Sequence, residues 1–500
     1  MNDEIARAYD RTPYPDFAFW ATHPDHLGMF GRLFGVATAP SERCRVLEIG
    51  CAVGGNLLPM AAALPGSRFV GVDLSGVQIA RAVEAASTVG LDNITFIHGD
   101  FREVSGRGGP FDYIICHGVF AWVDAPTQAA LLTFMHERLA PNGVAFVSYN
   151  TYPGHHMVDM VRKVLTVHTA NAPDLVTRND QALAVMRFLH RMSKKVEGDW
   201  RTGFFEREIR QMQDAGLDLL EHDYCARESQ PLYFRDFVQI CGGAGLAYLA
   251  DSSPWGMYLD NHGPEIVEAL KPLGDLVMQG QYLDFIMHTR YRETLICQAA
   301  APLTRDVPAT RIQQFYIGQA LSAEPTLDGL RESLPVQILV ARRPPMTVSN
   351  PIIRLALHRL WRHGRWTPSF DQLAQEVAAD LDSHGIASVD RATLRDRLAA
   401  QLLRAFFANA VRFTTRCPAI ARTLPERPET GAYQRYMARE RRPGLTSLTH
   451  EVFEASPMMN ALVPLLDGTR DPAALQASSP EPIGESLAEL LRKGFIAASR

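Results

Sequence analysis

The 500-residue sequence has few cysteines, and no two of them are spaced as C-x-x-C. Its cysteines are odd in number and scattered, which indicates neither a disulfide framework nor a zinc site. Such cysteines are typical of small, buried, reduced side chains in a cytoplasmic protein. The adjacent pair His155 and His156 is too little on its own to indicate a metal site. The seven cysteines are Cys44, Cys51, Cys116, Cys225, Cys241, Cys297 and Cys417.

Long apolar runs and a strong net charge are also absent. No apolar stretch approaches the ~20 residues that span a bilayer, and residues 1–4 lack the basic start of a secretory signal. We therefore expect a cytoplasmic protein without a membrane span. A formal net charge of -5 argues against a protein that binds polyanions over its whole surface. The length exceeds one hydrophobic core, so we expect roughly two to four domains.

From residue 44 to residue 150, short apolar runs alternate with amphipathic segments. This alternation predicts right-handed βαβ units around a parallel sheet, and therefore an α/β fold for a first domain over residues 1–154. The runs typical of buried strands are 45–49, 68–72, 94–97, 113–116 and 144–148. The segments typical of helices are 56–63, 76–86 and 127–139.

The strongest motif is V-L-E-I-G-C-A-V-G-G-N over residues 46–56, where an apolar strand ends in an acid and glycines lead into a helix. Gly50 allows a tight turn close to a ligand, and Gly54 and Gly55 allow the helix to approach the strand. The G-x-G-x-x-G spacing of dinucleotide sites is absent, and Glu48 would repel a pyrophosphate. That carboxylate suits a ligand with an ammonium group, which favours S-adenosylmethionine over NAD.

Further polar residues follow the next predicted strands. Asp73 stands 25 positions after Glu48, close to the spacing that places a carboxylate against ribose hydroxyls. Asp100 ends the third strand, where an adenine amino group could donate to it with Phe101 beside the ring, and the fourth strand runs into a loop at His117. The carboxyl ends of strands are where open α/β sheets bind ligands, so these signals support one another.

Beyond residue 154 the pattern becomes helical. We expect a helical insertion over 155–217, and a homodimer contact is one role left open for it. Residues 218–300 return to sheet, with a helix at 231–245 and strands at 246–250 and 291–299 that we interpret as late strands of the first sheet.

The last part of the chain is mostly helical. Residues 301–347 are irregular and rich in proline, as is typical of a linker or middle segment. Three helices predict a winged-helix-like domain at 348–412, and a C-terminal helical domain follows at 413–500. The helical stretches behind these predictions are 351–363, 369–380, 390–408, 446–466, 471–476 and 483–494.

The motifs from Glu48 to Asp100 and the strand ending at His117 resemble the successive cofactor motifs of class I S-adenosylmethionine-dependent methyltransferases. The resemblance implies a Rossmann-like sheet with S-adenosyl-L-methionine as cofactor. Ala52 stands where a glycine is common in that family, which implies a slightly reshaped methionine pocket. The cofactor-binding residues that the resemblance implies are Glu48, Gly50, Cys51, Gly54, Asn56, Asp73, Leu74, Gln78, Asp100, Phe101, His117 and Gly118.

A closer resemblance covers most of the chain. Y-D-x-x-P-Y-P from Tyr9, H-G-V-F-A-W-V from His117, S-Y-N-T-Y-P-G from Ser148 and E-x-x-P-L-Y-F from Glu228 are similar to bacterial protein lysine methyltransferases that modify outer-membrane proteins. The last motif lies in what is called the methyltransferase regulatory region. The winged-helix-like C-terminal half strengthens the likeness. It implies that a protein is the substrate and that a lysine is the acceptor.

Methyl transfer from a sulfonium is an in-line displacement, so the protein mainly positions the acceptor and excludes water. Aromatic faces and hydroxyls can hold a cationic amine. The same side chains could instead pack the core or anchor a loop. The candidate residues near the methyl group are Tyr9, Tyr14, His117, Trp122, Tyr149, Asn150 and Tyr152.

Two other functions are weighed against protein methylation. One is a small-molecule methyltransferase whose C-terminal half serves dimerisation. The other is a non-catalytic, donor-sensing regulator that binds DNA, for which residues 354–365 supply basic side chains, but acids over 371–382 weaken any basic patch, so nucleic acid binding is not favoured. Protein methylation is favoured because roughly 250 residues beyond the catalytic core offer a docking surface that a small substrate does not need.

Overall fold

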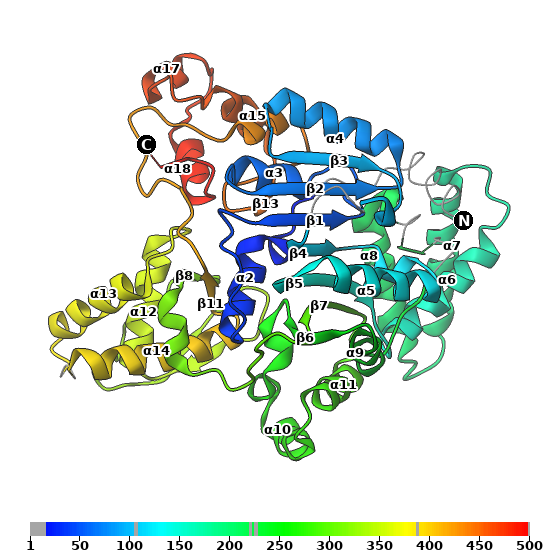
Figure 1. The fold of residues 1–500 in the computed structure, drawn as a ribbon, viewed down its shortest axis with the longest axis horizontal. Helices are drawn as coiled ribbons and strands as arrows, with labels where there is room; N and C mark the ends of the chain where they lie inside the picture. Colours follow the sequence, from blue (N-terminus) through cyan, green and yellow to red (C-terminus); the bar gives the residue numbers. More distant parts are fainter. Residues whose placement is uncertain (1–16, 105–108, 220–222, 225–228, 387–389, 499–500) are drawn as a thin grey trace.

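The computed structural model describes residues 17–104, 109–219, 223–224, 229–386 and 390–498, without the side chains of 215–219 (Figure 1). Its centre is a seven-stranded sheet in the order β3-β2-β1-β4-β5-β7-β6. The neighbours from β3 to β5 pair in parallel, and β7 runs antiparallel to both β5 and β6. The strands are β1 Arg45–Ile49, β2 Arg68–Asp73, β3 Ile94–His98, β4 Phe111–Cys116, β5 Leu139–Asn150, β6 Leu246–Asp251 and β7 Tyr291–Gln298.

The two faces of the sheet are covered by different helices because side chains alternate along each strand. Val46 and Phe146 belong to the core on the face covered by α2 (Pro24–Leu33) and α3 (Leu57–Ala63). Leu47 and Val147 belong to the core on the opposite face, with α5 (Ala125–Arg138) and α9 (Phe234–Gly243). Each such buried apolar side chain contributes about 1.5–3 kcal/mol relative to exposure.

Capping residues explain small differences from the predicted helix limits. Asp124 accepts a hydrogen bond from the backbone N of Thr127, so α5 begins at Ala125 rather than at 127. Helix α4 (Gly76–Val89) begins after Ser75, whose side chain accepts from the N of Gln78, and it ends at Gly90 with φ 78.

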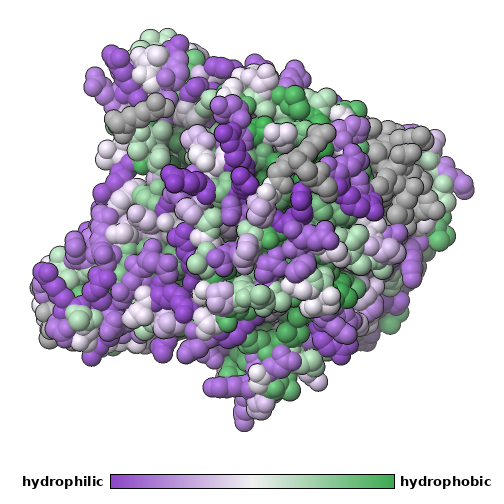
Figure 2. Space-filling model, in the orientation of Figure 1, coloured by the Kyte–Doolittle hydropathy of each residue, from purple (hydrophilic) through white to green (hydrophobic). Residues whose placement is uncertain are grey.

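The helical insertion predicted for 155–217 consists of α6 (His155–His168), α7 (Leu175–Ser193) and α8 (Arg201–Leu219). These helices share a small apolar core of their own, which includes Val161, Leu165 and Met186. The chain then returns through α9 to β6 and β7, so the prediction of late strands of the first sheet is confirmed. Between them lie α10 (Pro264–Leu270) and α11 (Leu276–Met287), where apolar side chains gather on the surface in Figure 2.

Residues 301–347 differ from the irregular linker expected for them. Strand β8 (Tyr316–Gln319) pairs antiparallel with β11 (Val411–Thr414), and β9 (Val336–Ile338) pairs with β10 (Met346–Val348). The prolines between these short strands hide them in the sequence. The four short strands pack with three helices. The core of this unit is continuous with the core on the face of the main sheet that α2 and α3 cover. The three helices are α12 Pro351–His363, α13 Phe370–Ser383 and α14 Arg391–Phe407.

The end of the chain forms a unit that packs on α3 and α4. The prediction of a helix over 446–466 is wrong. A hairpin of β12 (Gly444–Thr446) and β13 (Val452–Glu454) occupies the first part of this range. The helix that follows, α16 (Pro457–Leu462), is short. The helix begins only at Pro457 because Ser456 caps its N-terminus and proline is favoured at the first helical position. The other helices of this unit are α15 Ala432–Arg439, α17 Pro472–Ala477 and α18 Gly484–Arg492. Within the described ranges, no helix has the length and apolar character needed to cross a bilayer.

Candidate active site

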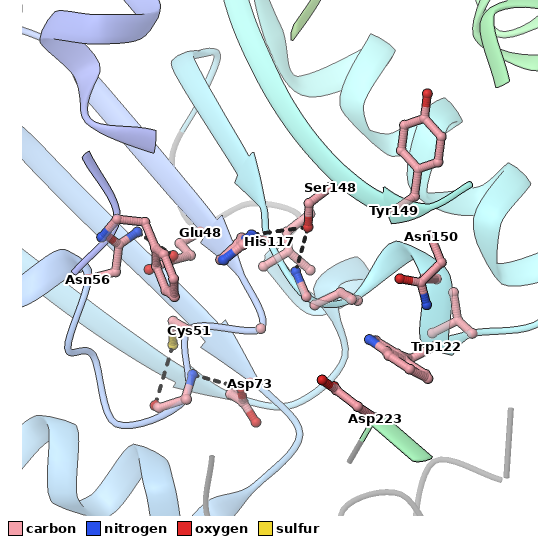
Figure 3. A pocket seen from close by; sticks show the side chains of 18 of the residues that line it. Glu48, Cys51, Asn56, Asp73, His117, Trp122, Ser148, Tyr149, Asn150 and Asp223 are labelled. Atoms are coloured by element: carbon pink, nitrogen blue, oxygen red, sulfur yellow. Dashed lines mark hydrogen bonds between the residues drawn. The ribbon is translucent and has the colours of Figure 1, made fainter. Parts of the chain in front are cut away.

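A cavity of about 810 Å³ opens at the carboxyl ends of the central strands (Figure 3). The structure brings Glu48, Asp73 and Asp100 to its wall, as expected for acids at successive strand ends. The other candidate residues on the wall are Gly50, Cys51, Asn56, Leu74, Gln78, Phe101, His117, Gly118, Trp122, Tyr149 and Asn150.

The turn after β1 comes close to the cavity because its backbone takes left-handed conformations. Gly50 has φ 76, and a Cβ there would stand 2.3 Å from Cγ2 of Val119. Ala52, with φ 47, donates its backbone N–H to Oδ2 of Asp73 over 2.9 Å. Gly54 does not line the cavity: a Cβ on it would stand 2.7 Å from the ring of Phe96, so this glycine serves the packing of the turn against β3.

Glu48 is buried at the inner end of the cavity. Its Oε1 accepts a hydrogen bond from Nδ2 of Asn56 over 2.7 Å, whereas its Oε2 has no partner among the described residues. Burial raises the pKa of Glu48 to about 8, which the Asn56 hydrogen bond opposes and the nearby Asp73 reinforces. A buried carboxylate oxygen without a partner is the natural complement of an ammonium group.

The two other acids are already engaged by the protein. Asp73 accepts from the backbone N–H groups of Ala52 and Ser75, each over 2.9 Å, which orients its carboxylate at the tip of β2. Asp100 accepts from Nε and Nη2 of Arg102, each over 2.7 Å, in a partly exposed pair that the sequence motif does not reveal. The buried Oε1 of Gln78 has no partner in the described part of the chain. The wall therefore holds acceptors for a ligand that carries ammonium, hydroxyl and amino groups.

His117 stands where β4 leaves the sheet. Its Nδ1 lies 3.0 Å from Oγ of Ser148 and 3.3 Å from the hydroxyl of Tyr291, while Ser148 accepts from the N of Gly118 over 2.9 Å. The ring of Phe19 packs edge-on at 4.1 Å. Burial lowers the pKa of His117 to about 4, so the imidazole is neutral at physiological pH.

The tyrosine candidates are only partly placed at the cavity. Tyr149 borders it, but its ring stacks on Phe237 at 4.1 Å and its hydroxyl lies 3.3 Å from Oγ1 of Thr294, directed away from the cavity (Figure 3). Tyr152 is not on the wall, because its ring stacks on His156 and its hydroxyl donates to Asp159. The alternation of side chains on β5 sends Tyr149 into the core. Tyr9 and Tyr14 lie outside the described residues.

The far side of the cavity combines the predicted Trp122 with residues of the insertion and of the segments after it, which the sequence motifs did not indicate. Trp122 lies there with Asp223 (Figure 3). The guanidinium of Arg162 sits 5.3 Å from the centre of the Trp122 ring. Burial raises the pKa of Asp223 to about 6, an effect that Arg162 opposes. The further wall residues on this side are His155, Val158, Gln211, Asp214, Tyr224, Arg290 and Tyr291.

An ion pair between the buried Glu208 and the partly exposed Arg290 supports this side. Glu208 of α8 accepts from Nη2 of Arg290 over 2.8 Å and from the hydroxyl of Tyr224 over 2.9 Å. Helix α8 is thereby bonded to Arg290, which directly precedes β7, and to Tyr224. Among the residues that the structure describes, no group of three or more His, Cys, Asp or Glu side chains is arranged to hold a metal ion.

Three family models match separate parts of the chain. A methyltransferase domain matches residues 46–143, a predicted methyltransferase regulatory domain matches 197–298, and the C-terminal winged helix domain of PKMT matches 426–481. The last match lies in the C-terminal unit, and not in 348–412, where three helices predict a winged-helix-like domain.

The relatives agree with these matches. The Rickettsia prowazekii protein RP789 is 30% identical over 395 residues, which are 78% of this chain and 71% of that protein. A second protein of that organism, RP028, is 32% identical over 232 residues, 46% of this chain and 92% of its own length. The structure of PKMT2 from Rickettsia typhi in complex with AdoHcy has the same fold, with a TM-score of 0.84, 24% identity, and coverage of 97% of this chain and 100% of that one. The chain belongs to the S-adenosylmethionine-dependent methyltransferases that combine a class I core, a methyltransferase regulatory domain and a C-terminal winged helix of the PKMT type.

Proposed function

We propose that this chain is a protein lysine N-methyltransferase, with the methyl donor in the half of the cavity next to Glu48 and the acceptor amine in the half next to Trp122 and Asp223. The observation that carries the proposal is Asp223, a carboxylate with a raised pKa that faces the same cavity as the donor motifs. The donor half and the acceptor half are supported by different residues.

In the donor half, Glu48 would hold the ammonium group of S-adenosylmethionine with its unpartnered Oε2. Asp73, at the tip of β2, would accept from the ribose hydroxyls. Asp100 and Phe101 would lie at the adenine. Gln78 offers an acceptor oxygen that is buried without a partner in the residues described, which supports a polar ligand at this wall.

In the acceptor half, the charge and the ring system suit a cationic amine. Asp223 is mostly ionised at neutral pH even with its pKa near 6. The indole of Trp122 adds an aromatic face on the same side of the cavity (Figure 3). An anionic small molecule would be repelled by Asp223 and by Asp214, which also lines this half.

The reaction requires little acid–base chemistry from the protein. Bound S-adenosylmethionine supplies an activated methyl group on a sulfonium. The lysine ammonium would first lose a proton, for which Asp223 is a suitable acceptor, and the cavity would hold the free amine in position to accept the methyl group. The neutral His117, fixed by Ser148 and Tyr291, would keep the loop after β4 in place while the cavity walls exclude water.

The comparisons support a protein as the acceptor. The winged helix model is that of PKMT, the protein lysine methyltransferases, and the Rickettsia typhi PKMT2 structure spans the same architecture over nearly the whole chain. We also propose a cytoplasmic location. A homodimer contact through residues 155–217 stays a prediction. Helices α6 and α8 of this insertion contribute residues to the cavity wall.

The test is methyl transfer with a labelled donor. The full chain would be incubated with labelled S-adenosylmethionine and outer-membrane or cellular proteins, and peptides would be mapped by mass spectrometry. An Asp73→Ala variant, whose affinity for the donor is expected to be lower, is the control and should transfer less label at a limiting donor concentration. Label on lysine side chains is expected. Label on small molecules alone would instead show that the chain is a small-molecule methyltransferase. Tight binding to one DNA site without turnover would establish a donor-sensing regulator.

A further inference from the structure

A histidine of the winged helix contacts a residue that lines the cavity. His450 lies in the turn between β12 and β13, within the segment that matches the winged helix model, and it is only 3% exposed. Its Nε2 lies 3.0 Å from Oδ1 of Asn56, a wall residue that is 394 positions earlier in the chain. The C-terminal unit therefore makes a buried polar contact with Asn56, the residue that donates a hydrogen bond to Glu48.

The amide of Asn56 is fully used, and each partner fixes its orientation. Nδ2 donates to Oε1 of Glu48 over 2.7 Å and to Oγ1 of Thr22 over 2.9 Å. Oδ1 accepts the backbone N–H of Phe19 over 3.0 Å and lies 3.3 Å from the hydroxyl of Thr22. Because an amide oxygen has no proton to donate, Nε2 of His450 is the donor in its 3.0 Å contact with Oδ1. A flipped amide would set its NH₂ group against the N–H of Phe19 and its oxygen against the Glu48 carboxylate.

The surroundings of His450 keep this contact neutral and buried. The ring of His23 lies 5.1 Å from that of His450, and burial lowers the pKa of His450 to about 3. The chain before the winged helix is tied to the same region, because Oδ1 of Asp25 accepts the backbone N–H of Thr415 over 2.7 Å. His450 therefore acts as an uncharged hydrogen-bond donor in a fixed position.

We infer that His450 is a positioning residue for the methyl donor: through Asn56 it holds Oε1 of Glu48, and it thereby leaves Oε2 directed to receive the donor's ammonium group. The winged helix is then a structural part of the cofactor site. This inference rests on the donor placement proposed above, and it does not depend on the identity of the acceptor.

The test is calorimetric binding of S-adenosylhomocysteine to the full chain, without any acceptor. His450→Phe keeps the ring volume but removes the donor, and it should weaken binding about five- to tenfold. His450→Gln places an amide N–H near the same point and should restore affinity to within about threefold of the wild type. Leu475→Ala, a fully buried change in α17 of the same unit, should lower stability and leave affinity within about twofold at a temperature where the chain is folded.

A double-mutant cycle separates positioning from general stability. In a Glu48→Gln background, His450→Phe should have little further effect on affinity for S-adenosylhomocysteine, because His450 acts on the ligand only through Glu48. Equal affinity of His450→Phe and the wild type would overturn the inference, as would additive effects in the cycle or an equal loss in Leu475→Ala. Should His450→Phe fail to fold, a loss in His450→Gln as large as that in Glu48→Gln would also overturn it. Failure of the wild type to bind at all would instead overturn the proposed donor placement.

Discussion

The backbone N–H of Ala52 lies 2.9 Å from Oδ2 of Asp73, so the glycine turn after β1 is bonded to the tip of β2. Ala52 adopts φ 47 at a point where the first methyltransferase motif commonly has glycine. The left-handed conformation is costly for alanine, and the hydrogen bond to Asp73 offsets part of that cost. One carboxylate therefore orders the turn and also faces the cavity.

Replacement of Asp73 by alanine should weaken donor binding by about 1–3 kcal/mol, because it leaves ribose hydroxyls unpaired and frees the Ala52 N–H. Titration calorimetry with S-adenosylhomocysteine would measure this. Asp92→Ala, at an exposed position before β3, is the matched control and should bind normally. Unchanged affinity in Asp73→Ala would remove Asp73 from the cofactor site.

Glu48 should make the stability of the donor-free protein depend on pH. Its pKa is raised from 4.5 to about 8 by burial, so the folded state retains a proton that the unfolded chain releases. This contribution is complete below about pH 4.5 and is lost as the pH rises towards 8. Urea unfolding should show that decline in the wild type and a smaller one in Glu48→Gln.

Donor binding should in turn release a proton from Glu48 at pH values between about 5 and 7, because an ammonium group favours the ionised carboxylate. Calorimetry in two buffers of different ionisation enthalpy would count the protons. Binding without proton release, in the wild type as in Glu48→Gln, would mean that the ligand leaves Glu48 protonated.

Tyr149→Phe should leave the reaction almost unchanged. The lost hydroxyl contacts only Thr294 among the described residues, so the expected effect is a loss of about 0.5–1.5 kcal/mol in the free energy of unfolding, with kcat within about twofold. Tyr291→Phe, which removes the hydroxyl 3.3 Å from His117, should reduce kcat/KM more. A larger catalytic defect in Tyr149→Phe than in Tyr291→Phe would place the Tyr149 hydroxyl in the chemistry after all.

Asp223→Asn should raise KM for the protein acceptor by roughly tenfold or more, since a charge-assisted hydrogen bond to the amine is lost. Affinity for S-adenosylhomocysteine should stay within about twofold. In the wild type, KM should also rise as the pH falls below about 6 and Asp223 becomes protonated, and the Asn variant should lack this dependence. Asp180→Asn on the exposed face of α7 is the control. If the steady-state kinetics of Asp223→Asn match those of the wild type, Asp223 does not bind the acceptor amine.

The residues of the proposed donor half can be grouped from the sequence because they depend on local patterns. Each acid stands at the end of its own apolar strand, and parallel strands bring those ends to one edge of the sheet. Glu48, Asp73 and Asp100 could therefore be assigned to one cavity without knowledge of the three-dimensional contacts. The conformation of Gly50 follows from the same turn.

The proposed acceptor half, apart from Trp122, could not be predicted in this way. Tyr291 reaches His117 only because β7 inserts antiparallel beside β5, and Asp223 reaches the cavity only because α6 to α8 fold over it. Neither position carries a motif. The hairpin around His450 was hidden in a stretch that resembles a helix, and its contact with Asn56 depends on the packing of the last unit against α3 and α4.

The separation of Asn56 and His450 by 394 positions also has a consequence for biosynthesis. Chains fold domain by domain as they leave the ribosome, beginning at the N-terminus. The central sheet can thus form long before the last fifty or so residues are translated, yet Asn56 still lacks one of its hydrogen-bond partners. A message that stops before codon 450 would encode a chain whose sheet is complete and whose cofactor site is not.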